Sequence, residues 1–411
     1  DINRILIPNK VALRFAALST DQRTPRELQY MRRNSAYLNL TLQPFKGATI
    51  NLNAETGRID ELNPRPYLAY DSVSAWLNDP RTPLQKANTI DRVLVESGST
   101  AARNAARNII TGVSQGFSTT NYLVYVMNAP QLGVQNWNFK SKGSEAFVNG
   151  LTQNQTSISS ATRVPSVNFP LDTIVSGPSD YFDTTYDKLS ASWQQRILDK
   201  TFFELAGAYE KSKNEDWQPV SRGDYEVFID NNYYLPTQLA ANNPDPTKPL
   251  NPYFGTPYIE SNSTLQNRDT TMKQYRATLT RQFDLSRIEP IKGFDFGKFT
   301  AVAFHYYRHV DSYFAQPEEM TTTSVLASGI LSDTQNQIRR RYYLTPDQPV
   351  TFPAFVPSQT RITQPGNPAV PGSVIPAGTS AFLHRLNPVY APETTQSYAA
   401  IGQWELFSRR L

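Results

Sequence analysis

The sequence predicts an all-β fold, an antiparallel up-and-down transmembrane β-barrel of which about eight strands are present. Three observations support this prediction: apolar and polar residues alternate in several segments, the connections between these segments alternate in length, and aromatic residues fall near the predicted strand ends. Hydrophobic residues make up 39% of the chain and charged residues only 18%. Asn, Gln, Ser, Thr, Pro and Tyr supply the difference, a mixture that suits strands, turns and long polar loops.

The clearest pair of strands is a β-hairpin predicted over residues 35–55, with its turn at residues 44–47. Every second residue of each arm is apolar, for example Leu38 in the first arm and Ile50 in the second. A period of two sends successive side chains to opposite faces of a sheet. The polar face carries amides and hydroxyls, such as Asn39, where a water-facing sheet usually shows Lys and Glu. The hairpin alone is therefore compatible with a soluble sandwich and with a membrane barrel around a polar lumen.

Six further segments show the same alternation and are predicted to be strands. They are residues 10–19, 186–194, 202–210, 272–283, 298–308 and 396–406. In the segment 298–308 we assign Val302 and Phe304 to the apolar face and His305 to the polar face. The side chains that we expect to face a lumen are Asn39, Asn51, Glu204, Gln274, Arg276 and His305.

The connections between the predicted strands alternate between shorter and longer ones. The shorter ones are residues 44–47, 195–201 and 284–297, and residues 20–34 form a connection of medium length. The long ones are residues 57–185, 211–271 and 309–395. Up-and-down order places all short connections at one end of the sheet, an asymmetry that is typical of outer-membrane barrels and that a soluble sandwich has no reason to show. Strands of about 9 to 11 residues also match a tilted crossing of a bilayer.

Aromatic residues give an independent indication, because membrane barrels place Tyr, Trp and Phe at the two water interfaces. Tyr209 falls near the end with the long connections. The aromatic residues near the predicted short-turn end are Phe45, Trp193, Phe203, Phe283 and Trp404.

Composition excludes several other classes of protein. The chain has no cysteine, which removes disulfides, thiolate metal sites and cysteine nucleophiles. The formal charge of +4 is small, and its basic residues are scattered, so we expect no nucleic-acid partner. The longest nearly uninterrupted apolar run, residues 299–304, is far below the ~20 residues of a membrane helix.

Local motifs give no support for catalysis or for a bound cofactor. Ser114 lies in a G-x-S-x-G motif, but the strand-like sequence after it does not match the helix that this motif requires. His305 and His309 would lie about 13 Å apart on a strand, too far to share a metal. Glu204 and Glu210 would be about 20 Å apart on one strand face, too far for a glycosidase pair. We therefore predict no catalytic residue, no metal site and no cofactor.

Four loop segments carry further predictions. Residues 70–79 are predicted to form a short helix with Asp71 as its N-cap, and residues 121–127 an additional strand. Residues 230–232, "DNN", offer oxygen ligands but lack the Gly and distal Glu of a calcium loop. We expect the arginines of "RRRYY", residues 339–343, to be solvated in a long polar loop.

Five blocks, taken in order, resemble the barrel of outer-membrane TonB-dependent receptors. They are "RPYLAYDSVSAWL" (65–77), "DNNYYLP" (230–236), "NPYFGTPYIES" (251–261), "YRATLTRQFDL" (275–285) and "RRRYYL" (339–344). The resemblance implies a barrel of about 22 strands around an N-terminal plug. It also implies a location in the cell outer membrane and import of a scarce nutrient such as a siderophore or other metal chelate, cobalamin or a glycan. A TonB-type energy-coupling protein would drive that import.

On this resemblance we expect residues 1–411 to be a partial receptor barrel with long outer loops, an internal piece without plug, TonB box or signal sequence. The coupling protein would act through the missing N-terminal region, and outer-membrane lipid would surround the barrel. The ligand contacts of the family follow no motif that could be transferred to this chain. Two alternatives remain: a secreted β-rich protein that binds or cleaves carbohydrate, and a passive porin.

Overall fold

The structure is a computed structural model. It describes residues 1–26, 28–62, 70–71, 80–87, 122–137, 174–220, 226–235, 249–285, 297–323, 336–345, 352–354, 363–364 and 378–405. Strands dominate these residues, and the helical elements among them are two 3-10 turns, η1 (Leu84–Lys86) and η2 (Pro130–Leu132). No helix in this part of the chain is long and apolar enough to cross a membrane.

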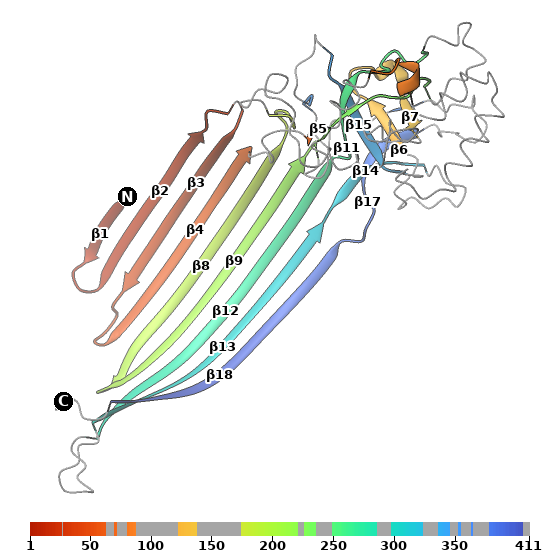
Figure 1. Ribbon diagram of the computed structural model, residues 1–411. Coiled ribbons are helices and arrows are strands. Elements are labelled where there is room, and N and C mark those ends of the chain that lie inside the picture. Colours follow the sequence, from red (N-terminus) through yellow and green to blue (C-terminus); the bar gives the residue numbers. More distant parts are fainter. Residues whose placement is uncertain are drawn as a thin grey trace.

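Nine strands in the described residues form one antiparallel sheet in which each strand pairs with its chain neighbours (Figure 1). We call it the long sheet. Its strands, in order, are β1 (Ile2–Ile7), β2 (Val11–Arg23), β3 (Tyr30–Leu42), β4 (Ala48–Leu62), β8 (Tyr181–Leu198), β9 (Thr201–Gln218), β12 (Thr264–Asp284), β13 (Lys298–Ala315) and β18 (Val389–Glu405). The predicted antiparallel up-and-down fold is confirmed, and β1 adds one strand to the eight predicted.

The strands are longer than predicted. β2 and β3 have 13 residues each and β12 has 21. The alternation of apolar and polar residues marks only the part of a strand that has one apolar face. Backbone hydrogen bonding continues beyond it, where both faces are polar, as at Arg58 opposite Thr185.

The predicted hairpin is present in the predicted register. Leu38 lies opposite Ala54, Asn39 opposite Asn53 and Leu42 opposite Ile50. Leu38 and Ile50 therefore share one face, since directly opposed residues point to the same side of an antiparallel pair.

The short and long connections lie at opposite ends of the long sheet, as predicted (Figure 1). Residues 8–10, 43–47 and 199–200 form tight connections at what we call the short-turn end. The chain leaves the opposite, loop end between β4 and β8, between β9 and β12, and between β13 and β18.

These three long connections build a second sheet, which we call the cap. It consists of β5 (Tyr70–Asp71), β10 (Glu226–Ile229), β11 (Pro257–Ser261), β15 (Ile338–Tyr343), β6 (Tyr122–Val126) and β7 (Val134–Trp137), in this spatial order. The β5–β10 and β15–β6 pairs are parallel, whereas the other pairs are antiparallel. The additional strand predicted at 121–127 is confirmed as β6. Tyr70 and Asp71 form β5 where a helix was predicted to begin, and residues 72–79 lie outside the described residues.

A rim hairpin joins the two sheets. β14 (Pro317–Thr321) follows β13 and pairs with β17 (Gly378–His384), which precedes β18 and also pairs with β16 (Thr363–Gln364). Glu318 of β14 pairs with Thr264 of β12, and Met320 forms a bridge to Gln337 beside β15. The pairing of β13 with β18 is therefore extended by the pairing of β14 with β17, and β14 also contacts the cap through the bridge to Gln337.

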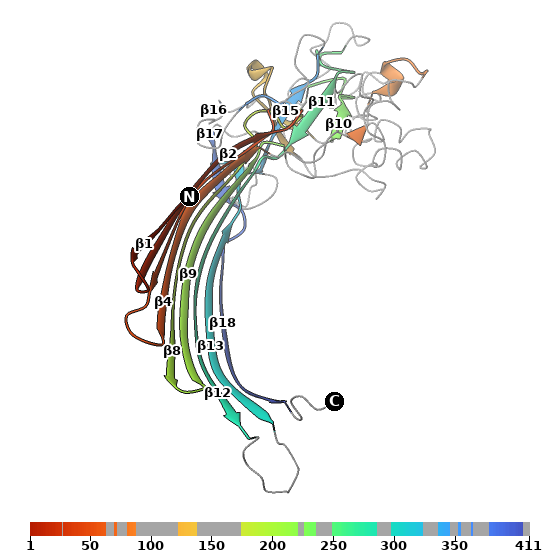
Figure 2. The same cartoon turned by 90° about the vertical axis from the view of Figure 1, so that its left-hand side faces the viewer.

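The buried apolar residues gather in and under the cap. One cluster contains Val175, Trp217, Val220, Val227, Ile229, Ile259, Tyr342 and Phe352. Figure 2 shows the long strands bending into one arc, with the cap above their loop end on the side toward which they curve.

Gly177 holds Phe352 in this cluster and gives the first prediction. Its φ is +80°, and a Cβ there would lie 2.0 Å from the carbonyl oxygen of Phe352. Gly133 has a φ of +62° but open space around its Cβ position. The ψ of Gly133 is −157°, in a region that is essentially restricted to glycine, so we expect Gly133→Ala to cost about 1–3 kcal/mol for the backbone alone. Gly177→Ala should cost at least about 1–3 kcal/mol more, because Phe352 must move.

The measurement is the free energy of unfolding of both variants in denaturant. Equal losses would show that Phe352 does not pack against Gly177.

Candidate functional site

One face of the long sheet is a polar wall built from aligned residues of neighbouring strands. Asn39 of β3, Asn53 of β4, Ser190 of β8, Ala208 of β9 and Gln274 of β12 follow one another directly across the sheet. Directly opposed residues share a face, so this row and the rows two residues away form a continuous surface.

Hydrogen bonds between side chains run across this wall. Asn39 Nδ2 donates to Asn53 Oδ1 at 2.6 Å, and Asn53 Nδ2 donates to Ser190 Oγ at 3.1 Å. Thr41 Oγ1 donates to Asn51 Oδ1 at 2.9 Å. Amides both donate and accept, so the wall can satisfy its own groups and still present donors and acceptors to a solute.

Two ion pairs lie in the middle of the wall, and Arg308, in the row of Gln274, donates to Met272 Sδ at 3.4 Å. Arg276 Nη2 donates to Glu204 Oε1 at 2.5 Å, and Lys188 Nζ lies 3.6 Å from Glu210 Oε1. Both pairs are partly exposed, so each contributes little to stability. Each pair adds charged groups to the wall without adding net charge.

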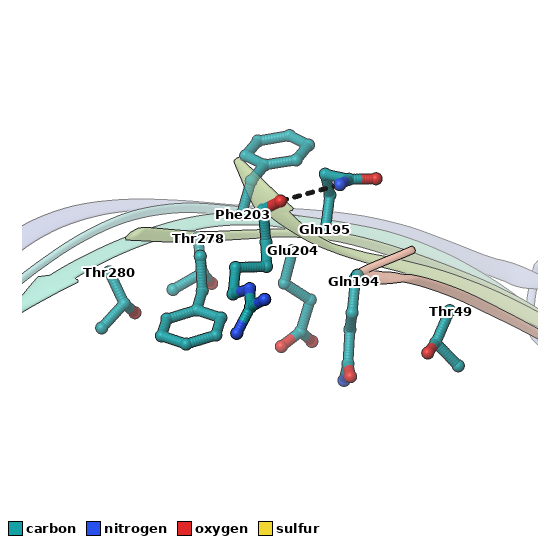
Figure 3. Close-up of a pocket in the computed structure, with 10 residues that line it drawn as sticks. Thr49, Gln194, Gln195, Phe203, Glu204, Thr278 and Thr280 are labelled. Carbon is teal, nitrogen blue, oxygen red and sulfur yellow. Dashed lines mark hydrogen bonds between the residues drawn. The ribbon is translucent and has the colours of Figure 1, made fainter. Parts of the chain in front are cut away.

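The wall is the concave side of the sheet. Figure 3 shows Thr49, Gln194, Glu204 and Thr278, which are direct partners on four strands, beneath the arched ribbon, whereas Phe203 lies on the other side. Near the short-turn end these side chains border an open hollow of about 470 Å³ that also includes Arg196.

Five of the six residues predicted to face a lumen lie on this concave face, namely Asn39, Asn51, Glu204, Gln274 and Arg276. His305 does not, and its assignment was wrong. It lies opposite Ala277 and Tyr398, in the row that includes Leu205 on the convex face. Both faces of β13 carry apolar residues, and only pairing with β12 shows which face is which.

The convex face is apolar and uncovered in the described part of the chain. The exposed fractions of Leu52, Leu189 and Leu205 are 38%, 57% and 43%. Their neighbours in the long sheet, such as Leu38 and Leu279, are also exposed. A contiguous apolar surface of this kind indicates contact with lipid or with another protein.

Aromatic residues form two groups on the convex face. Near the short-turn end, Trp193 contacts Phe203 with ring centroids 5.8 Å apart, and Phe299 contacts Trp404 at 5.6 Å. Phe283 lies beside Phe299. Closer to the loop end, the ring centroids of Tyr275 and Tyr307 are 4.9 Å apart, and those of His305 and Tyr398 are 4.5 Å apart. Tyr209 lies on this face as well, opposite Leu189 and Lys273, and Phe45 lies in the turn between β3 and β4.

The cap contains a buried network of charges centred on β15. Arg341 Nε and Nη2 donate to Glu260 Oε2 at 2.9 and 2.7 Å, and Arg341 Nη1 donates to Asp230 Oδ2 at 3.2 Å. The guanidinium lies 3.9 Å above the ring of Tyr258. Tyr343 donates its hydroxyl hydrogen to Asp230. This one arginine therefore joins β10, β11 and β15.

The two neighbouring arginines are also buried and paired. Arg339 Nε donates to Glu260 Oε1 at 2.7 Å. Arg340 points to the opposite face, where its Nε and Nη2 donate to the two carboxylate oxygens of Glu319 at 2.7 Å each. The expectation that these arginines are solvated was wrong, because each meets a carboxylate from another part of the fold.

Residues 230–232 have a structural role in this network. Asp230 Oδ1 accepts from the backbone N–H and the Nδ2 of Asn232, and Asp230 Oδ2 accepts from Asn251 Nδ2 at 3.1 Å. Together with Arg341 and Tyr343, these donors occupy both carboxylate oxygens. Among the described residues, no group of three or more His, Cys, Asp or Glu side chains is placed to hold a metal ion.

Burial and charge shift the acid–base properties of the network. Burial by itself lowers the pKa of Arg341. The neighbouring Tyr258 and Tyr343, with the carboxylates of Glu260 and Asp230, outweigh it and leave that pKa well above its usual value. Burial, followed by the charge of Asp230, raises the pKa of Tyr343 well above its usual value. Arg341 is thus a permanent cation and Tyr343 a neutral donor.

Two other sequence motifs have different outcomes. Ser114 lies outside the described residues, so its G-x-S-x-G motif stays untested. His305 and His309 lie on one strand with separate partners: His305 Nε2 is 3.3 Å from Gln396 Nε2, whereas His309 contacts Thr394 and Asp311.

No protein-family model matches the chain, and no curated protein sequence matches it. Among solved structures it aligns with BauA, the ferric preacinetobactin receptor from Acinetobacter baumannii, with a TM-score of 0.42 and 10% identity over 98% of this chain and 36% of that chain. It also aligns with the RagAB peptide importer in the closed-closed state, with a TM-score of 0.37 and 10% identity over 97% of this chain and 29% of that chain. A third alignment is with Fiu, the ferric-catecholate import receptor from E. coli K12, with a TM-score of 0.30 and 12% identity over 98% of this chain and 44% of that chain. The chain therefore spans less than half of the length of each of these proteins.

Glu260 is the shared partner of two buried arginines, and its replacement gives the second prediction. In Glu260→Gln, Arg339 and Arg341 lose their common negative charge, and we expect a loss of about 3–5 kcal/mol in the stability of the cap. Asp183→Asn is the control, because Asp183 also accepts two bonds from one arginine, Arg58, at 2.8 Å each, but on the exposed surface. It should cost less than about 1 kcal/mol. Hydrogen exchange of β10, β11 and β15 measures the loss in Glu260→Gln, and exchange of β4 and β8 around Asp183 measures that in the control. A loss in Glu260→Gln no larger than in the control would contradict the prediction.

The raised pKa of Tyr343 gives the third prediction. An unfolded tyrosine ionises near pH ~10, whereas the folded residue stays protonated above that pH. Because the pKa of Tyr343 is higher in the folded state, this group stabilises the folded protein fully below about pH 10. The stabilisation is lost as the pH rises further. We expect the free energy of unfolding to fall by about 1.4 kcal/mol per pH unit for this group. In Tyr343→Phe, denaturant titrations at several alkaline pH values should show a slope reduced by one proton, and identical slopes would refute the assignment.

Proposed function

We propose that the chain forms part of the barrel wall of an outer-membrane, TonB-dependent receptor that binds and imports a scarce nutrient. The observation that carries the proposal is the pairing of an uncovered apolar convex face with a polar concave face on one long antiparallel sheet. Hydrocarbon would contact the side of Leu52 and Leu205, and water or solute the side of Asn51 and Gln274. A soluble sandwich would instead bury the apolar side against a second sheet.

The dimensions of the convex face support this orientation. Tyr307 lies eight positions after Phe299 along β13, about 26 Å of strand, which corresponds to about 20 Å along the membrane normal for strands tilted by about 40°. The apolar band of outer-membrane barrels is ~25 Å tall and lies between two girdles of aromatic residues. The two aromatic groups of the convex face fit these girdles, with the short-turn end on the periplasmic side.

The edges of the long sheet support a closed barrel. β1 and β18 are its two edges, and unpaired backbone groups cannot remain exposed to hydrocarbon. As the first and ninth strands of an antiparallel series, they run in the same direction and cannot pair with each other in an antiparallel way. Closure therefore needs an odd number of further strands between them, consistent with the even strand numbers of bacterial barrels.

The ligand and the coupling partner are parts of this proposal. The cap lies above the loop end, where a ligand from outside would first arrive. A siderophore or other metal chelate, cobalamin or a glycan would bind there, and a TonB-type protein would supply energy from the periplasmic side through an N-terminal region. The role is binding and transport, without a catalytic step or a cofactor.

The fourth prediction tests the location and the orientation. We expect the full-length protein to sediment with the outer membrane and to need detergent for extraction. On β4, Leu52→Arg places a charge toward hydrocarbon and should cost about 2–4 kcal/mol in assembly, whereas Asn51→Arg on the concave face should cost much less. The fraction of heat-modifiable, protease-resistant protein measures assembly. A protein that stays soluble without detergent, or equal effects of the two variants, would overturn the proposal.

A further inference from the structure

We propose that the cap is one rigid body, assembled from three loops by buried ion pairs and latched to the rim hairpin by Arg340, so that access to the concave wall changes only when the whole cap moves. The movement rests on the proposed function, because it assumes that solute reaches the wall from the loop end. The rigidity of the cap does not.

The first argument is the origin of the cap strands. β6 and β7 come from the connection between β4 and β8, β10 and β11 from that between β9 and β12, and β15 from that between β13 and β18. β15 pairs with β11 on one side and with β6 on the other. Two ladders thus connect all three loops, and no loop can leave without breaking the sheet.

The second argument is the burial of the charges between these strands. The side chains of Arg341 and Asp230 are fully buried, and that of Glu260 is 1% exposed. Separating them would leave uncompensated charges in a buried site, which is far more costly than breaking an exposed ion pair. Independent opening of a single loop is therefore strongly disfavoured.

The third argument locates the latch. On β15, Arg339 and Arg341 face Glu260 within the cap, whereas Arg340 faces Glu319 of the rim hairpin. Ser380 of β17 also donates its hydroxyl hydrogen to Glu319, at 2.9 Å. Next to it, Glu318 accepts from Arg385 at 2.9 Å and from Gln337. Of these contacts, Arg340 to Glu319 and Gln337 to Glu318 connect the segment of β15 to the rim, and those of Ser380 and Arg385 lie within the rim and orient the two glutamates.

The geometry separates two kinds of contact. Pairs to Glu260 and Asp230 hold the cap together. Arg340 to Glu319 and Gln337 to Glu318 are the polar contacts that hold the cap to the rim, in addition to the packing of Trp217 and Phe382 in the shared apolar cluster. Weakening the second set should release the cap as an intact body. Weakening the first should break the cap itself.

The test uses the absence of cysteine from the chain, which makes labelling of an introduced thiol free of background. In the full-length protein, Ser190→Cys places a thiol on the concave wall. Its rate of reaction with a maleimide-coupled polyethylene glycol, added outside intact cells, reports access from the loop end. Glu319→Gln removes the charge of the latch, and Asp183→Asn is the matched control on the exposed pair with Arg58.

We expect Glu319→Gln to raise the labelling rate at least about tenfold and Asp183→Asn to leave it within about twofold. Hydrogen exchange of purified protein should show β6, β10, β11 and β15 still protected together in Glu319→Gln. An unchanged labelling rate would overturn the latch, and faster exchange confined to one cap strand would overturn the rigid body.

A second variant covers the case in which Glu319→Gln does not assemble. Gln337→Ala removes only the hydrogen bond from Gln337, beside β15, to Glu318 of the rim, and should raise the labelling rate by a smaller factor, between control and Glu319→Gln. A rate equal to the control would contradict the latch. Failure of the proposed function is recognised separately, because a protein outside the outer membrane would still allow the exchange experiment on the rigid cap.

Discussion

The long sheet depends on its backbone hydrogen-bond ladder, because it has no hydrophobic core of its own. Its apolar side chains lie on the convex face, where Leu52, Leu189 and Leu205 remain substantially exposed. An apolar face of this kind requires a covering of lipid or protein, and in the proposed setting lipid covers one face and water the other. The alternation along each strand therefore gives the sheet two faces of different polarity, with polar amides such as Asn39 and Asn53 on one side and leucines on the other.

The buried apolar core lies in and under the cap, which the long connections form. Val175, Ile229, Tyr342 and Phe352 come from the three long connections and meet in and under the cap. Loops of this length lose much conformational entropy when they become ordered. Apolar burial offsets part of this loss, and the buried pairs of Arg341 select one arrangement among the many that would bury the same apolar area. The two parts of the molecule therefore use opposite strategies.

The sequence was sufficient for elements whose faces differ chemically and insufficient where both faces are alike. The hairpin at residues 35–55 was predictable because its faces carry leucines and amides. On β13, one face carries Ala301 and Ala303 and the other Val302 and Phe304, so only the pairing with β12 decides the side of His305. The cap strands are too short for a periodic pattern, and the partners of Arg339 and Arg340 lie 79 and 21 positions away.

Three consecutive arginines on one strand follow from the position of β15 between two buried acidic partners. Alternation sends Arg339 and Arg341 to Glu260 and sends Arg340 to Glu319. A slip of one residue would place a single arginine on the side of Glu260 and two on the side of Glu319, and would leave buried charges unpaired. Because unpaired buried charges are very costly, only the observed register is allowed. The ion pairs therefore contribute less by adding stability than by excluding every alternative pairing of the three loops.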